Sequence, residues 1–274
     1  MILPDAGFDW NVTQHEAALR AGFFLAIFAV VAVAETAAPR RPRALKRSLR
    51  WLGNLCMHVV NALFPRLLFP VLPVGMAVLW AEKGWGLLNI IPAPRWVAAI
   101  LTLVALDGLV YVQHFLFHRV RPLWLLHRMH HTDMDLDLTS ALRFHPLEIL
   151  ISLLLKMAMV ALLGPPAAVV LAFEVLLNGM AMFTHANLRI PAPADGLLRQ
   201  VFVTPDMHRF HHSVLPREFN RNFGFNLSLW DRLFKTYQAQ PAAGHTGMTI
   251  GLTGFRDPAY ARFWKMMLLP WEKR

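Results

Sequence analysis

The chain has 274 residues, of which 56% are apolar and only 16% are charged. Soluble domains carry about 25% charged residues, so the composition indicates a membrane protein and excludes a soluble globule. The net charge of +10 comes largely from Arg and Lys beside apolar runs, which favours a positive-inside bias over nucleic-acid binding. The single cysteine, Cys56, excludes an intramolecular disulfide and a multi-cysteine metal site.

Five apolar runs predict five membrane-spanning helices. They cover residues 21–34, 57–80, 96–113, 149–163 and 167–183. The second run contains Pro65, Pro70 and Pro73, which we expect to kink a single span. A Gly-Pro-Pro sequence at 164–166 separates the last two runs and predicts a tight helical hairpin.

A dense series of Arg and Lys at residues 40–50 follows the first span. Positively charged loops stay on the cytoplasmic side, so we expect the N-terminus to lie outside. Counting five crossings from there places residues 114–148 and 185–274 together on the cytoplasmic face.

Eight of the thirteen histidines recur at helical spacings after the third and fifth spans. In a helix the first and third histidines of an HxxHH triple share one stripe, and the middle one is rotated away, so each triple can serve two metal ions. A lone histidine more often caps a helix or lies at the interface, but eight buried imidazoles need partners. Imidazole binds Fe, Zn, Cu and Ni, so the spacing leaves the metal open. The eight are His114, His118, His127, His130, His131, His208, His211 and His212.

Several longer stretches carry a resemblance to a known family. They are DGLVYVQHFLFHR (107–119), LWLLHRMHH (123–131), RFHPLE (143–148), FTHANL (183–188), TPDMHRFHHS (204–213), NFGFNLSLWD (222–231) and RLFKTY (232–237). Over about residues 100–240 the chain resembles the fatty acid hydroxylase and sterol desaturase superfamily. One departure is Lys235, where that family often has Gly.

The resemblance implies an all-α, multi-span transmembrane protein with a cytosolic helical cap that holds a His-rich dimetal site. It divides the chain into an N-terminal transmembrane region with a basic cytoplasmic loop (1–95), a catalytic domain (96–240) and a C-terminal cytosolic tail (241–274). The eight motif histidines match the family's metal ligands, and so does His185. His145 is a further ligand candidate, although Pro146 also suits a structural turn there.

Carboxylates beside the motifs are candidates to orient the ligating rings. Asp107 lies seven residues, or two helical turns, before His114 and is the first choice, with Asp231 as the second. Glu148 is also near, and Asp206 is expected to cap a helix instead. We expect no catalytic residue beyond the metal centre.

The resulting hypothesis is an integral-membrane di-iron oxidoreductase that uses O2 to hydroxylate or desaturate a C–H bond of a lipid, such as a sterol or fatty acyl chain. Two Fe ions are expected as cofactors, and Zn is the alternative metal for the same site in the purified protein. Without a dinucleotide motif or cysteine set, electrons come from a separate donor protein, for which Arg128, Arg209 and Arg217 suit an acidic partner. The alternatives are a zinc-dependent lipid hydrolase, which lacks an HExxH motif here, and a divalent-metal transporter or sensor, whose ligands belong near the midplane.

Overall fold

The computed structural model describes residues 14–91 and 93–273, and every regular element in that part is a helix. Five helical segments are long and apolar enough to cross a membrane within it, which confirms the all-α, multi-span prediction. The helices of these segments are α2 (Glu16–Ala37), α3 (Arg47–Leu68), α4 (Pro73–Lys83), α5 (Leu87–Ile90), α6 (Arg95–Arg119), α8 (Pro146–Leu163) and α9 (Ala167–His185).

The second apolar run differs from the single kinked span that its sequence predicts. Helix α3 keeps Pro65 in its last turn and ends at Leu68. Pro73 then begins α4, because proline at the first helical position has no N–H to lose. The chain therefore turns between two helices, and α4 packs on α8 and α9. The other four spans are each a single helix, as predicted.

The hairpin of α8 and α9 forms where the Gly-Pro-Pro sequence predicts it. Gly164 takes a left-handed φ of +59° and ends α8, a conformation that costs glycine little. A Cβ at Gly164 would lie only 2.3 Å from the Trp85 carbonyl. The hairpin turn is therefore in close backbone contact with the α4–α5 connection.

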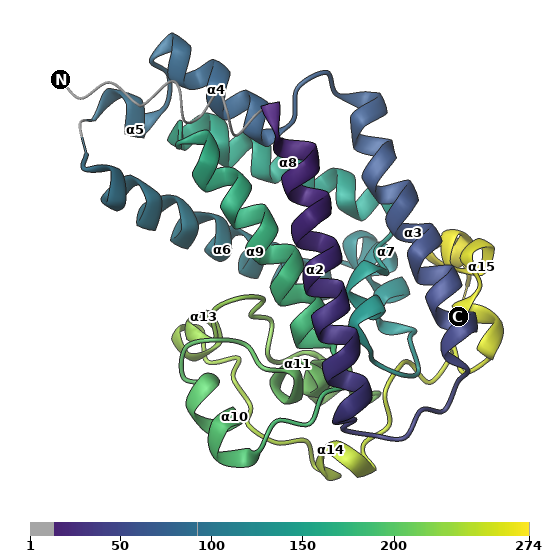
Figure 1. The fold of residues 1–274 in the computed structure, drawn as a ribbon. Helices are drawn as coiled ribbons and strands as arrows, with labels where there is room; N and C mark the ends of the chain where they lie inside the picture. The colour runs from purple at the N-terminus through teal and green to yellow at the C-terminus, as the bar shows by residue number, and fades with distance from the viewer. Residues whose placement is uncertain (1–13, 92, 274) are drawn as a thin grey trace.

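Short helices gather at one end of the spans and form the cap (Figure 1). It begins with α7, which carries the first histidine triple, and ends with the C-terminal segment. Their bounds are α7 (Arg121–His131), η1 (Leu138–Leu142), α10 (Ala192–Leu198), α11 (Pro205–His211), α12 (Pro216–Phe219), α13 (Leu229–Leu233), α14 (Gly244–Gly247), η2 (Pro258–Ala261), α15 (Phe263–Leu268) and η3 (Leu269–Trp271).

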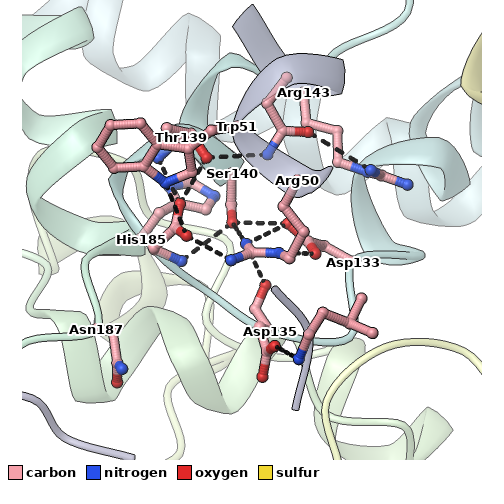
Figure 2. A network of polar contacts seen from close by, with 12 residues as sticks. Arg50, Trp51, Asp133, Asp135, Thr139, Ser140, Arg143, His185 and Asn187 are labelled. Carbon is pink, nitrogen blue, oxygen red and sulfur yellow. Dashed lines mark hydrogen bonds and ion pairs between the residues drawn. The ribbon is translucent and has the colours of Figure 1, made fainter. Parts of the chain in front are cut away.

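A fully buried guanidinium, that of Arg50 on α3, joins the cap to the spans (Figure 2). It donates to both oxygens of Asp133 at 2.8 Å, and also to Asp137, to the Asp135 carbonyl at 2.7 Å and to Ser140 at 3.0 Å. Burial alone would raise the pKa of Asp133, but the facing guanidinium lowers it below its usual value. The loop after the first histidine triple is thus held against α3 by paired charges.

The basic segment between α2 and α3 is also fixed by the cap. Arg40 donates to Asp206 at 3.0 Å, and Arg41 donates to the carbonyls of His245 and Met248 at 2.5 and 2.6 Å. This segment therefore lies at the same end of the spans as the histidines, as the predicted crossings require.

We predict that Arg50→Gln destabilises the protein by about 3–5 kcal/mol, because it leaves buried carboxylates without their partner cation. Thermal unfolding in detergent micelles measures the loss. Arg189→Gln, at an exposed position of the cap, is the control and should change stability by less than about 0.5 kcal/mol. Equal effects of the two substitutions would contradict the role given to Arg50.

Candidate metal centre

Nine histidines meet in two groups where the cap joins α6 and α9. All are buried except His118, which is half-buried, and the ligand nitrogens of each group lie within 4.8 Å of one another. The first group is His114, His118, His127, His131 and His211, and the second is His130, His185, His208 and His212. The structure thus brings together the eight motif histidines and His185.

Each triple is divided between the two groups. Helix α7 gives His127 and His131 to the first group and His130 to the second. The triple that begins on α11 does the reverse, with His208 and His212 in the second group and His211 in the first. This is the arrangement predicted from the spacing, since the middle residue of each triple points to a different side of its helix.

Five of the imidazoles are oriented by hydrogen bonds through Nδ1. The acceptors are oxygens that cannot donate, so the proton is on Nδ1 and the lone pair is on Nε2. The contacts are His114 to the Phe223 carbonyl (2.8 Å), His211 to that of Arg221 (2.8 Å), His130 to that of Arg143 (3.2 Å), His185 to that of Ala181 (2.7 Å) and His127 to the Glu148 carboxylate (2.7 Å).

The free lone pairs fit a bound cation. In the first group, Nε2 of His114, His127 and His211 is buried without a hydrogen-bond partner. In the second, Nε2 of His185 lies 3.0 Å from Nε2 of His130 and 3.0 Å from that of His208. His130 and His185 both carry their proton on Nδ1, so their facing lone pairs repel unless a cation lies between them. Two nitrogens that bind one ion at right angles, each about 2.1 Å away, are about 3.0 Å apart.

The environment keeps five of these rings uncharged. Burial, followed by the charge of neighbouring imidazoles, lowers the pKa of His130, His131, His208 and His212 well below the usual value. Burial lowers the pKa of His211 to about 3. Neutral imidazole is the form that binds a metal, so the groups are ready to bind cations at neutral pH.

His145 lies outside both groups. Its Nδ1 accepts from the Leu147 N–H at 3.2 Å, which caps α8, and its Nε2 donates to the Met267 carbonyl at 3.3 Å. Both ring nitrogens are engaged, so His145 has the structural-turn role that Pro146 also suggests. It is not part of the proposed ligand set.

Glu148, rather than the expected Asp107, is the carboxylate that contacts a candidate ligand. Asp107 instead accepts from Trp230 Nε1 at 2.8 Å. Asp231 supports a candidate ligand indirectly. It accepts from the N–H of Phe223 at 2.8 Å, and the carbonyl of Phe223 accepts from His114. The signal for Glu148 is its position two residues after Pro146, in the first turn of α8.

The expected helix cap at Asp206 is also wrong. Thr204 caps α11, with its hydroxyl accepting from the Met207 N–H at 3.3 Å. Asp206 lies in the first turn and pairs with Arg40 and Arg209. The polar residue that precedes Pro205 was the better signal, because proline favours the position after the cap.

Lys235, the departure from the family pattern, has a left-handed φ of +58°. This conformation favours glycine, which gives a backbone reason for the usual residue there. The turn places Thr236, whose hydroxyl donates to Asp231 at 2.7 Å. Lys235 itself is exposed.

Two of the three arginines proposed to bind an electron donor are buried. Arg128 donates to the carbonyls of Leu269 and Glu272, both at 2.6 Å, and Arg209 pairs with Asp206. Burial lowers the pKa of Arg209 to about 10. They hold the cap together, and only Arg217 is exposed.

A cavity of about 690 Å³ reaches the first group of histidines from between the spans. Its lining comes mainly from α2, α3, α6, α8 and α9 and includes His114, His127 and Glu148 at the cap. Phe117 and Phe144 line it nearby, and Arg20 and Lys156 line it farther along the spans. The cavity thus connects the membrane-spanning part with the candidate metal ligands.

The fatty acid hydroxylase family model matches residues 99–236, half of the chain. An ornithine lipid hydroxylase of Rhizobium tropici is 34% identical over 161 residues, covering 59% of this chain and 47% of that protein. Alkylglycerol monooxygenases of Xenopus tropicalis and Homo sapiens are 30% and 29% identical, covering 57% and 61% of this chain but 34% and 36% of theirs. The chain therefore matches less than half of the length of these relatives. No solved structure matches it significantly.

We predict that Glu148→Gln weakens metal binding about 10–100-fold, because the ring of His127 loses its charged acceptor. Titration of the apoprotein with Fe(II) under anaerobic conditions measures the affinity. Asp107→Asn is the matched control, since Asp107 contacts Trp230 and not a histidine, and its metal affinity should equal that of the wild type. A larger effect from Asp107→Asn would restore the assignment made from the sequence.

Proposed function

Because the chain belongs to the fatty acid hydroxylase family, we propose that it is a membrane-embedded, di-iron oxygenase that acts on a lipid. The observation that carries this proposal is the cavity between the spans, which ends at His114 and His127. A lipid in that cavity has its apolar part among the spans and a bond to be oxidised beside the candidate ligands. The relatives are named as a lipid hydroxylase and as monooxygenases, and these names support the same reaction class.

Bound iron would supply activation of O2, so that one oxygen atom enters a lipid C–H bond and the other leaves as water, with two electrons and two protons consumed. The chain contributes orientation and exclusion of water. Nδ1 contacts such as that of His127 with Glu148 hold each ring in place. Apolar walls that include Phe117 and Phe144 keep water from the reacting bond.

Hydroxylation is favoured over desaturation, and a polar lipid over a sterol. Both inferences rest on the relatives, whose names give an ornithine lipid and alkylglycerols as substrates. The zinc-hydrolase alternative is less well supported, because nine imidazoles exceed the three protein ligands of a usual catalytic zinc site. The transporter alternative is less well supported because the ligands gather at one end of the spans.

Electrons are proposed to come from a separate donor protein that docks on the cap. Arg217 and Arg221 are exposed there, and the carbonyl of Arg221 accepts from His211 at 2.8 Å. A negatively charged donor would thus bind close to the first group of histidines. The catalytic part is proposed to comprise residues 96–240. Residues 1–95 are proposed as the transmembrane region that precedes it, and residues 241–274 as the C-terminal segment that follows it.

We expect purified protein reconstituted with iron to hold about two ions per chain and, with an electron donor, to place 18O from 18O2 in a lipid product. His130→Ala and His211→Ala each remove a ligand from a different group, so each should lower the iron content and reduce product to background. His15→Ala, at an exposed position outside both groups, is the control. Unchanged iron in both ligand variants would refute the proposed site.

The cap is proposed to lie in the cytoplasm, on the basis of the Arg-rich segment at residues 40–50. The C-terminal segment belongs to the cap, since Arg128 of α7 donates to the Leu269 carbonyl. Fluorescent protein fused to the C-terminus of the whole chain should therefore fluoresce in a bacterial host, and alkaline phosphatase fused there should be inactive. The reverse pair of results would invert the topology.

A further inference from the structure

Three charged side chains from three spans meet in the wall of the cavity, away from the histidines. Lys156 of α8 donates to one oxygen of Glu174 of α9 at 2.5 Å, and Arg20 of α2 donates to the other. All three line the cavity. The side chain of Glu174 is 8% exposed, that of Lys156 18% and that of Arg20 22%. We call Arg20, Lys156 and Glu174 the ion-pair cluster.

Positive charge exceeds negative charge in the cavity wall around this cluster. Glu174 shares its carboxylate between two cations, and Arg66 of α3 lines the same cavity. Glu16 accepts from Arg20 at 2.7 Å, which still leaves three cations with two carboxylates. The cation in excess is Arg66, which is exposed and donates to the Ala62 carbonyl at 2.5 Å. Arg20 divides its donors between Glu16 and Glu174, and Lys156 donates to Glu174.

A polar stripe connects the ion-pair cluster with the metal end of the cavity. Glu148, Ser152 and Lys156 follow one another at intervals of four on α8, so they share one face, and all three line the cavity. Gln113 of α6 donates to Ser152 at 2.5 Å. Eight residues separate Glu148 from Lys156, about 12 Å along the helix at a rise of about 1.5 Å per residue. The cluster therefore lies at a fixed distance from the candidate ligands.

We propose that the ion-pair cluster binds the anionic group of a bilayer lipid through Arg20 and Lys156, and that the carboxylate of Glu174 competes with the lipid for these two cations. Arg66, at the exposed end of α3, adds positive charge along the same wall. This inference rests on the proposed function, because a lipid held by its anionic group presents a bond at a set distance to the metal end. The cluster then determines which position of the lipid is oxidised.

The test uses opposite substitutions in the same ion pair. Lys156→Gln removes a cation and should weaken binding of an anionic lipid at least about tenfold, the loss of one charge-assisted hydrogen bond. Glu174→Gln removes the competing carboxylate, so it should keep or strengthen that binding. Lys156→Arg keeps the positive charge, so this variant should bind the anionic lipid as the wild type does. Lys83→Gln, at an exposed position on α4, is the control for loss of a surface cation.

Native mass spectrometry of the iron-loaded protein in detergent measures binding of phosphatidylglycerol, phosphatidylcholine and diacylglycerol with identical acyl chains. We expect preference for phosphatidylglycerol in the wild type and its loss in Lys156→Gln alone. Equal affinities for all three lipids, or equal losses in Lys156→Gln and Glu174→Gln, would show a purely structural ion pair and overturn the proposal. Displacement of the lipid by millimolar inorganic phosphate would also overturn it, since the ligand would then be a free anion.

The same variants separate this proposal from the proposed function. If 18O enters a lipid at the same position in the wild type and in Lys156→Gln, the oxygenase stands and the anionic subsite fails. If no lipid is oxidised but phosphatidylglycerol is still bound through Lys156, the subsite stands and the oxygenase fails.

Discussion

The buried guanidinium of Arg50 is the contact on which the placement of the two histidine groups depends. Helix α7 carries one histidine triple, and a loop leads from it to η1. Arg50 holds this loop and η1 through Asp133, Asp137 and Ser140. Arg143 extends the same frame, because it donates to the Met129 carbonyl at 3.0 Å while its own carbonyl accepts from His130. Ligand nitrogens that lie within 4.8 Å of one another require a rigid support of this kind.

The buried imidazoles impose a second constraint. Five of the nine rings need acceptors for their Nδ1 protons, and the chain provides backbone carbonyls for four of them and the Glu148 carboxylate for the fifth. Three of these carbonyls, those of Phe223, Arg221 and Arg143, belong to residues between helices, where they lie outside helical hydrogen bonds. This explains why the cap consists of short helices and turns, whereas the cavity lies among long spans.

Local spacing carried most of what the sequence could predict. The division of each HxxHH triple between two groups follows from helical geometry, and the hairpin follows from Gly164 and its two prolines. The failures concern contacts between distant segments. Asp107 has the correct spacing from His114 but packs against Trp230, and Glu148 reaches His127 only because α8 crosses α7. From the sequence alone, Arg128 and Arg209 resemble surface charges. In the structure Arg128 donates to the C-terminal segment and Arg209 pairs with Asp206.

Sharing of α7 and α11 between the two histidine groups has a consequence for how metal is loaded. An ion bound in either group would hold both helices, because each helix contributes to both groups. Any freedom that the two helices keep would then be lost with the first ion, which would favour uptake of the second. Chains with both ions and chains with none should predominate over singly loaded ones, so a limited supply of metal yields fewer but complete centres.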